Sequence, residues 1–533
     1  MRDILILCSV GACLFAQHAH QTPPPPTEKP VALLAGLGTH VHPIATPNPL
    51  AQKFFDQGLN LLYGFNRYEA LRSFRKAAEL DPRAPMPLWG IAMALGPHIN
   101  MDMDGDVNLP EGCAALTKAA ALRATVHERA YLDAALSRCP SYQPARYIQA
   151  MHQLQHRYPD DLDAASFYAE SLMIPSRWQW WQADGLPAPG MAEAVSVLER
   201  VMRRQTNHPG ANHFYIHAVE MSPTPERAIP SAQRLMGIVP AAGHLVHMPG
   251  HIWLTLGDWD TAAAVNERAA QVDREYFART GVQSGYVGYF LHNLHFVAYA
   301  RAMQGRARQA IAEADTLIKE AGGMIEAMPE MADAVVPYPI FMRMRFQHWQ
   351  EILSMPKPSG KLLATTALWH WARAIASVAQ GDRAAAQREA ELFGAARAKV
   401  PPEYPWLLNK AAKVLAVAEA VLGARMAADQ AAAVEHWRRA VRLQDELAYD
   451  EPPPWYMPLR ESLGGALLRS GAAAAAETVF REGLRRSPRN GRMLFGLLKA
   501  LEASGQQEAA ALVRREFTRE WTSAGPALRI QDL

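Results

Sequence analysis

The sequence predicts an all-α protein, an α-solenoid in which antiparallel helix pairs stack into a superhelix. Three observations carry this prediction. Alanine is abundant and runs of β-favouring residues are few, a composition that suits helices. A helix, turn, helix pattern recurs from Ala51 onward, and self-similarity of this kind is typical of repeat proteins. The chain of 533 residues is also too long for one ordinary hydrophobic core, whereas an extended array accommodates it.

The overall charge is almost balanced, with 54 Lys plus Arg against 52 Asp plus Glu. No net field therefore favours nucleic acid or a membrane surface as a partner. We also find no Gly-rich phosphate loop, no HExxH metal motif and no Ser-centred nucleophile motif. The sequence thus predicts no nucleic-acid partner, and it identifies no catalytic residue.

The first residues predict export. The stretch from Ile4 to Phe15 is apolar and too short to span a bilayer, and small residues end it at Ala12 and Ala16. We expect a signal peptide over residues 1–16 and a periplasmic or extracellular mature chain. A second interpretation is a lipoprotein signal with Cys13 as the lipidated residue, which would be the chain's only membrane attachment.

The remaining chain divides by composition into a polar leader and two helical arrays. The leader contains a run of four prolines, which predicts an extended tether. The predicted parts are a leader over 17–50, an N-terminal array over 51–320, a connecting insertion over 321–365 and a C-terminal array over 366–533. Cys113 and Cys139 lie in the first array, where they form either a disulfide or two buried thiols.

One repeat unit, Gly243 to Glu275, is the clearest. It resembles the tetratricopeptide repeat, a helix pair of about 34 residues. The positions that carry the resemblance are Gly250 at 8, Trp253 at 11, Ala262 at 20, Asn266 at 24 and Ala269 at 27. Small residues at 8, 20 and 27 let two helices approach closely. A large residue usually fills position 24, so Asn266 departs from the family pattern.

Two further units fit the same template, one with Gly58 and Phe74 and one with Gly464 and Phe480. The chain also resembles a bacterial subgroup of exported repeat proteins, through the motifs HPIATPNPLAQKFFDQGLNLLYGFN, AGHLVHMPGHIWL and DEPPPWYMPLRESLGGALLRSG. Arg67 and His98 depart from that pattern, where we expect His and Asn. The resemblance implies a fold rather than a reaction.

Histidines concentrate in four short words, NHFYIHAVE, GHLVH, MPGHI and LHNLHF. Their spacings of three, four and seven residues place the members of each group on one helix face. In the repeat register they fall on one stripe of three successive first helices, which lines the concave groove of such solenoids. The candidate metal ligands are His213, His217, Glu220, His244, His247, His251, His292 and His295.

These residue types predict a transition-metal site, because imidazole is the commonest ligand of zinc, copper and iron in proteins. We expect His217, His247 and His251 nearest the centre, with Glu220 as the nearest carboxylate. A single helical histidine is usually structural, so the prediction depends on the whole group. Three readings stay open: a metalloenzyme, a metal carrier, and a scaffold whose groove holds a peptide or protein segment.

Two weaker features lie in the leader and in an acidic run. His40 and His42 in the leader either fold over the groove or form part of a capping strap. Alternating acidic residues at 102, 104 and 106 faintly resemble a calcium loop, but no glutamate follows at the twelfth position, which favours a solvated acidic turn.

Overall fold

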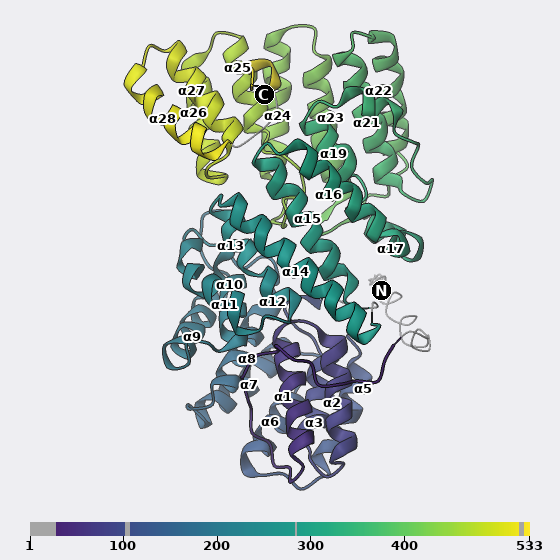
Figure 1. The fold of residues 1–533 in the computed structure, drawn as a ribbon, viewed down its shortest axis with the longest axis vertical. Helices are drawn as coiled ribbons and strands as arrows, with labels where there is room; N and C mark the ends of the chain where they lie inside the picture. Colours follow the sequence, from purple (N-terminus) through teal and green to yellow (C-terminus); the bar gives the residue numbers. More distant parts are fainter. Residues whose placement is uncertain (1–27, 102–106, 283–284, 522–526) are drawn as a thin grey trace, which may run out of the picture. The chain divides into compact units, whose positions relative to one another are not determined.

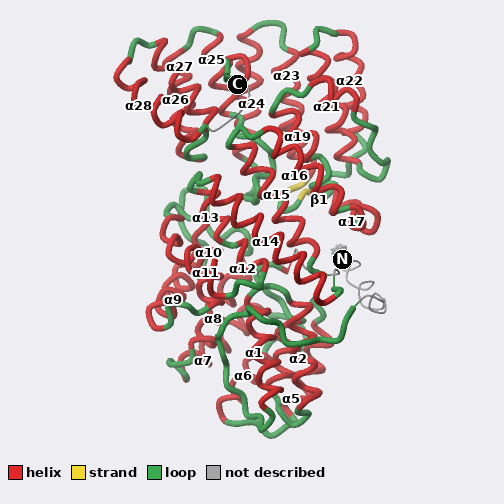
Figure 2. Tube along the Cα trace, in the orientation of Figure 1, coloured by secondary structure: helices red, strands yellow, loops and turns green. Residues whose placement is uncertain are grey.

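The computed structural model describes residues 28–101, 107–282, 285–521 and 527–533. The predicted signal peptide, Cys13 and the acidic run at 102–106 lie outside these residues. The described chain is almost entirely helical (Figure 2) and divides into two compact units. Unit 1 holds the described residues up to Pro175 together with Val272–Gly288, and unit 2 holds Ser176–Gln271 and Tyr289–Leu533.

Unit 1 consists of short helices that pack in succession, α1 on α2, α2 on α3, α3 on α5 and α7 on α8. Side-chain caps and prolines set the helix starts: Asn48 caps α1 ahead of Pro49, and Thr125 forms a capping box with Glu128 at the start of α6. The helices, labelled in Figure 1, are α1 Pro49–Tyr63, α2 Arg67–Leu80, α3 Met86–Ala94, α5 Leu109–Ala120, α6 Val126–Leu136, α7 Pro144–Arg157, α8 Leu162–Met173 and the short η1 Ile174–Ser176.

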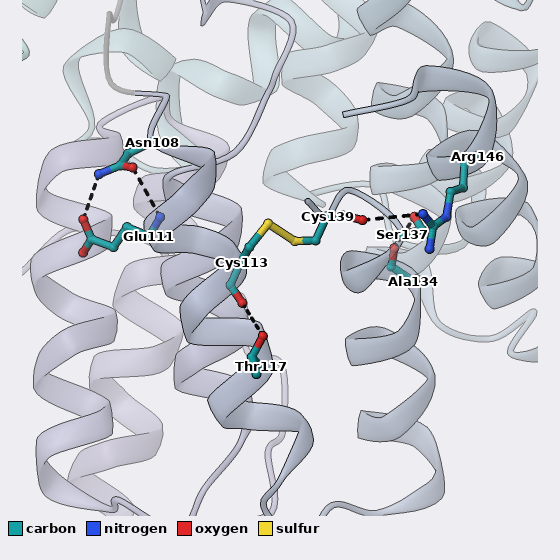
Figure 3. Close-up of a disulfide and its surroundings, with 8 residues drawn as sticks. All are labelled: Asn108, Glu111, Cys113, Thr117, Ala134, Ser137, Cys139 and Arg146. Atoms are coloured by element: carbon teal, nitrogen blue, oxygen red, sulfur yellow. Dashed lines mark hydrogen bonds between the residues drawn. A yellow bond between two sulfur atoms is a disulfide. The ribbon is translucent and has the colours of Figure 1, made fainter. Parts of the chain in front are cut away.

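A disulfide links the two cysteines of unit 1 (Figure 3), so of the two predicted alternatives the structure has the disulfide and not two buried thiols. Cys113 lies in α5, and Cys139 follows the end of α6. The bond joins residues 26 positions apart and therefore closes the α5–α6 hairpin covalently. Cross-links of this kind stabilise a fold mainly by restricting the unfolded chain.

Unit 2 is also built of helix pairs, among them α21 on α22, α23 on α24 and α27 on α28. The only sheet in the described residues is a two-residue antiparallel pair, β1 Pro405–Trp406 with β2 Asn409–Lys410. The all-α prediction is therefore confirmed.

The helices of unit 2 are labelled in Figure 1; α14 starts in this unit and its residues from 272 belong to unit 1. They are α9 Met191–Arg204, α10 Pro209–Glu220, η2 Pro225–Ala228, α11 Ile229–Ile238, α12 Gly243–His247, α13 Pro249–Thr255, α14 Trp259–Thr280, α15 Val287–Met303, α16 Ala307–Glu320, α17 Gly322–Ala327, α18 Pro329–Ala332, α19 Tyr338–Arg345, α20 Trp349–Ser354, α21 Leu363–Ala379, α22 Arg383–Arg397, α23 Ala411–Met426, α24 Gln430–Asp445, α25 Arg460–Arg469, α26 Ala473–Arg486, α27 Gly491–Ala503, α28 Gln507–Glu520 and η3 Ile530–Asp532.

The predicted small-to-large packing of the repeat is present in both units. A Cβ added to Gly58 would lie 2.7 Å from the ring of Phe74, sixteen residues later. The same added atom on Gly464 would lie 2.3 Å from the ring of Phe480, again sixteen residues later. Glycine on the first helix therefore lets the aromatic side chain of the second helix press against its backbone. Among the described helices, none combines the length and the apolar character that a membrane span requires.

Candidate metal centre

Six histidines converge inside unit 2, from the first helices of three successive pairs. The helix α10 carries two of them, α12 and α13 together carry three, and α15 carries one. The elements α12 and α13 are separated only by Met248, at a break that precedes Pro249, because proline cannot donate the next helical hydrogen bond. We call this group the histidine cluster; its members are His213, His217, His244, His247, His251 and His292.

The cluster separates into two groups of three. Within each group, the possible ligand atoms all lie within 4.8 Å of one another. The first triad consists of His213 and His217 on α10 with His244 on α12. The second triad consists of His247, His251 and His292, from α12, α13 and α15. The helix α12 thus contributes one histidine to each triad.

In each triad, two imidazoles meet through their Nε2 atoms. The Nε2 atoms of His244 and His213 are 3.1 Å apart, and those of His247 and His251 are 2.7 Å apart. The two triads are adjacent, because the ring centroids of His244 and His247 are 5.5 Å apart and those of His217 and His251 are also 5.5 Å apart.

Glu220 lies between the triads and contacts one imidazole of each. Its Oε1 accepts a hydrogen bond from His217 Nδ1 at 3.0 Å, and its Oε2 lies 2.7 Å from His251 Nδ1. Orientation of one ring nitrogen by a carboxylate fixes the tautomer, so that the other nitrogen is presented as a ligand. The nitrogen that His217 and His251 then present is Nε2.

Asn266, the residue that departs from the repeat pattern, orients the ring of His247 in the same way. His247 Nδ1 lies 2.6 Å from Asn266 Oδ1, and Asn266 Nδ2 donates to the carbonyl oxygen of Ala262 at 2.8 Å. A Cβ added to Gly250 would lie 2.4 Å from Asn266 Nδ2. The Gly-to-position-24 contact of the other repeats is therefore kept here, with an amide in place of an aromatic ring.

Glu451 is a member of the site that the sequence analysis missed. Its carboxylate contacts His251 Nδ1, on the same ring nitrogen that faces Glu220. Residue 451 belongs to the motif DEPPPWYMP, which resembles the exported subgroup but carried no predicted role. The signal that could have found it is an acidic pair, Asp450 and Glu451, inside an otherwise apolar and proline-rich connection.

The cluster is buried and does not line an open groove. Five of its histidines are 3% exposed or less, and only His292 is partly exposed. Aromatic rings from outside the repeat register cover it: Trp178 packs edge-on against His217 at 5.6 Å, and Tyr289 packs against His244 at 4.7 Å. The expectation of an open groove followed from the repeat register alone. The connection that carries Trp178 lies outside that register.

His295 is the one predicted ligand that the structure does not bring into the cluster. Its ring packs edge-on against Tyr338 of α19, with centroids 4.0 Å apart. Three residues fall about 60° short of a full helical turn, so His292 and His295 need not face the same neighbour. Burial lowers the pKa of His295 to about 3, which makes it a neutral core residue.

The electrostatics of the cluster keep most imidazoles neutral. Burial and the neighbouring imidazoles hold the pKa of His244 and His247 well below 6.5. Burial also lowers the pKa of His251, but the charges of Glu451 and Glu220 outweigh it and raise the value to about 10. Neutral imidazoles are the form that binds metal ions, and the two carboxylates supply compensating negative charge.

The two leader histidines lie in unit 1, where they pair with one carboxylate. His40 Nε2 lies 2.9 Å from Asp163 Oδ1, and His42 Nδ1 lies 2.8 Å from Asp163 Oδ2. The hydroxyl of Tyr63 donates to the same carboxylate at 2.6 Å. Within unit 1, these contacts tie the leader to α1 and α8.

Comparisons with known proteins concern only the fold. No protein-family model and no curated protein matches the sequence. Similar solved structures include the human IFIT1 dimer with m7Gppp-AAAA, at 11% identity over 90% of this chain and 92% of that chain, with a TM-score of 0.35. Yeast Tom70 is 12% identical over 88% of this chain and 92% of that chain, with a TM-score of 0.33. The P58(IPK) TPR domain is 12% identical over 86% and 99%, with a TM-score of 0.22.

At these identities and TM-scores the likeness carries no argument about binding or activity. The architecture is assigned from the chain itself, by successive antiparallel helix pairs and by the glycine-to-aromatic contact that recurs sixteen residues apart. This chain is an all-α protein of successive antiparallel helix pairs, whose glycine-to-aromatic contacts resemble those of the tetratricopeptide repeat.

Proposed function

We propose that this protein binds transition-metal ions through the histidine cluster. The observation that carries the proposal is the convergence of six imidazoles into two triads whose possible ligand atoms lie within 4.8 Å of one another. Imidazole suits zinc, copper, iron and nickel, and three neutral imidazoles form a common protein ligand set for such ions. Glu220 and Asn266 support the proposal because outer carboxylates and amides commonly orient metal-binding histidines.

A peptide-binding role for the same residues has less support. A side chain that grips a partner segment has to reach the surface, whereas five of the six cluster histidines are 3% exposed or less. Burying several imidazoles together is costly unless each is hydrogen-bonded or coordinates an ion. A metal ion would offset that cost, and a peptide on the outer surface would not.

The first test is the metal content of protein purified without a histidine tag. After chelation and dialysis against zinc or copper, we expect stoichiometric metal by elemental analysis. His247→Gln should lower the metal content, since His247 belongs to the second triad. His295→Gln is the matched control, because that buried histidine lies on α15 but outside both triads. Wild-type protein that stays metal-free under both loadings would rule out the proposal and favour a scaffold.

We also propose that the protein is exported. The apolar N-terminal segment motivates this, and the Cys113–Cys139 disulfide supports it, because disulfides persist mainly in oxidising compartments. Intact-mass analysis of protein from the native host should show loss of about 16 residues, by ordinary signal-peptide geometry. A full-length chain with reduced cysteines in the cytoplasmic fraction would contradict export.

A further inference from the structure

We infer that the histidine cluster is a two-ion centre, in which each triad holds its own metal ion and Glu220 orients one imidazole of each triad. The inference rests on the proposed function. It adds the number of ions, the ligands of each and the class of small ligand that the centre would take.

The cluster divides into two separate groups of ligands. Among the described residues, the two histidine triads share no member, and the grouping that joins them consists of His217, Glu220 and His251. One ion bound in the middle would draw ligands from both triads and leave the outer imidazoles unused. Two ions use all six imidazoles and leave the carboxylate between them.

The orientation of His247 and His251 directs both Nε2 atoms at one another. Asn266 Oδ1 can only accept, so the Nδ1–H of His247 donates to it and Nε2 of His247 presents a lone pair. His251 Nδ1 faces the carboxylates of Glu220 and Glu451, so Nε2 is the atom of His251 that faces His247, at 2.7 Å. In the metal-free protein this contact is a hydrogen bond, with one proton held between the two Nε2 atoms. A metal ion in the second triad would replace that proton.

The spacing of the imidazoles is close to that of a metal site. An ion with bonds of about 2.0–2.1 Å to imidazole holds neighbouring ligand nitrogens about 3.3 Å apart in a tetrahedral site. The Nε2–Nε2 distances of 3.1 Å in the first triad and 2.7 Å in the second are shorter than that value by about 0.2 and 0.6 Å. Small rotations of the rings would therefore open both triads to an ion.

Glu220 connects the two triads. Its two oxygens contact the Nδ1 atom of one imidazole in each triad, so a single carboxylate fixes the tautomer in both. Paired metal ions in proteins typically lie about 3.5–4 Å apart. Three protein ligands leave a coordination position open on each ion, which is typical of catalytic rather than structural sites. The ligand class that fits is a small oxygen donor or anion that bridges the ions.

The test is the stoichiometry of copper(II) and zinc(II) in variants that dismantle one triad at a time. All proteins are full-length, tag-free and carry His152→Gln with His156→Gln. That exposed pair on α7, with ring centroids 6.1 Å apart, could bind an adventitious ion. We expect two ions per chain in this background. One ion should remain after His213→Gln with His244→Gln, and one after His251→Gln with His292→Gln. His295→Gln should retain two.

The outcomes separate the inference from the proposed function. No bound ion in the background protein overturns both, whereas one ion overturns only the two-ion centre and leaves metal binding intact. Electron paramagnetic resonance of the copper(II) form provides a measurement that does not need the triad variants to fold. Two adjacent ions should give a coupled or strongly weakened signal that azide alters by bridging them. Two full isolated-ion signals, unchanged by azide, would contradict the inference.

Discussion

Two groups of histidines in this molecule are built from the same residue types but are balanced differently. In unit 1, the carboxylate oxygens of Asp163 lie 2.9 and 2.8 Å from ring nitrogens of His40 and His42. A carboxylate oxygen of Asp161 lies 2.8 Å from a ring nitrogen of His127. In unit 2, six imidazoles share the carboxylates of Glu220 and Glu451. The first group resembles a structural ion-pair network. The second contains six imidazoles and two carboxylates.

The two groups differ in the proportion of imidazole to carboxylate, although His42, Asp161 and Asp163 of unit 1 also lie close enough together to hold an ion. The carboxylates of unit 1 also accept hydrogen bonds from tyrosines, Tyr63 on Asp163 at 2.6 Å and Tyr131 on Asp161 at 2.8 Å. Those bonds use oxygen lone pairs that a metal would need. We therefore expect changes in unit 1 to alter stability, and changes in the cluster to alter metal affinity.

The largest expected effect is that of Asp163→Asn. Removing one partner of a buried charge pair typically costs ~3–5 kcal/mol, because the remaining charges stay buried. Chemical denaturation near pH 6 should show a loss of this order, while metal content stays at the wild-type value. If Asp163→Asn abolished metal binding without loss of stability, the assignment of structural and metal-binding roles to the two groups would be reversed.

The disulfide gives the next effect, also confined to unit 1. A cross-link that closes a loop of this length contributes ~3 kcal/mol by restricting the unfolded chain. The double variant Cys113→Ser with Cys139→Ser should lose stability by that amount. Hydrogen exchange should rise in α5 and α6 and stay unchanged in α10 to α13. Equal loss of protection in both regions would show that the two units unfold together.

A third test concerns the orientation of His247 in the histidine cluster. Asn266→Leu removes the acceptor that holds the proton of His247 on Nδ1, and loss of such an orienting partner typically lowers metal affinity ~10–100-fold. Asn266→Asp keeps an acceptor at the same place and should retain most of the affinity. Isothermal titration with zinc can compare the two variants. Equal affinities would mean that Asn266 only fills space between α13 and α14.

The smallest effect is a difference in pH dependence. Burial lowers the pKa of His42, but the hydrogen bond and charge of Asp163 outweigh it, so the pKa is raised above 6.5. Its stabilisation is therefore fully present below about 6.5 and is lost as pH rises through the folded pKa. The charged or titratable groups around His42 are His40, Asp56, His127, Tyr131, Asp161 and Asp163.

In metal-free protein the cluster should show the opposite trend. Burial lowers the pKa of four cluster imidazoles, those of His217, His244, His247 and His292, so the unfolded chain binds more protons there and stability falls as pH drops below about 6.5. The raised pKa values of His251, about 10, and Glu451, about 7, act in the opposite direction but are two groups against four. The opening free energies from hydrogen exchange, corrected for the intrinsic exchange rate at each pH, should change in opposite directions between pH 5.5 and 7.5 in α8 and in α12. The same direction in both would contradict the assignment.

Much of this architecture was predictable from the sequence. Spacing by 16 residues between Gly58 and Phe74, and between Gly464 and Phe480, predicted the close helix contacts that the structure contains. The histidine spacings, read in the repeat register, placed the candidate ligands on successive first helices. These predictions succeed because helix geometry is local, so the sequence alone determines which residues share a helix face.

The tertiary structure alone decided the make-up of the candidate site. Glu451 reaches His251 from 200 positions away along the chain, and no helical period relates the two. His295 turns to Tyr338 because α19 packs there, and Trp178 covers His217 from a connection outside the repeat. The departure at Asn266 was visible in the sequence, but its hydrogen bond to His247 was not. Contacts between side chains depend on how the helices and connections pack, which a repeat period does not specify.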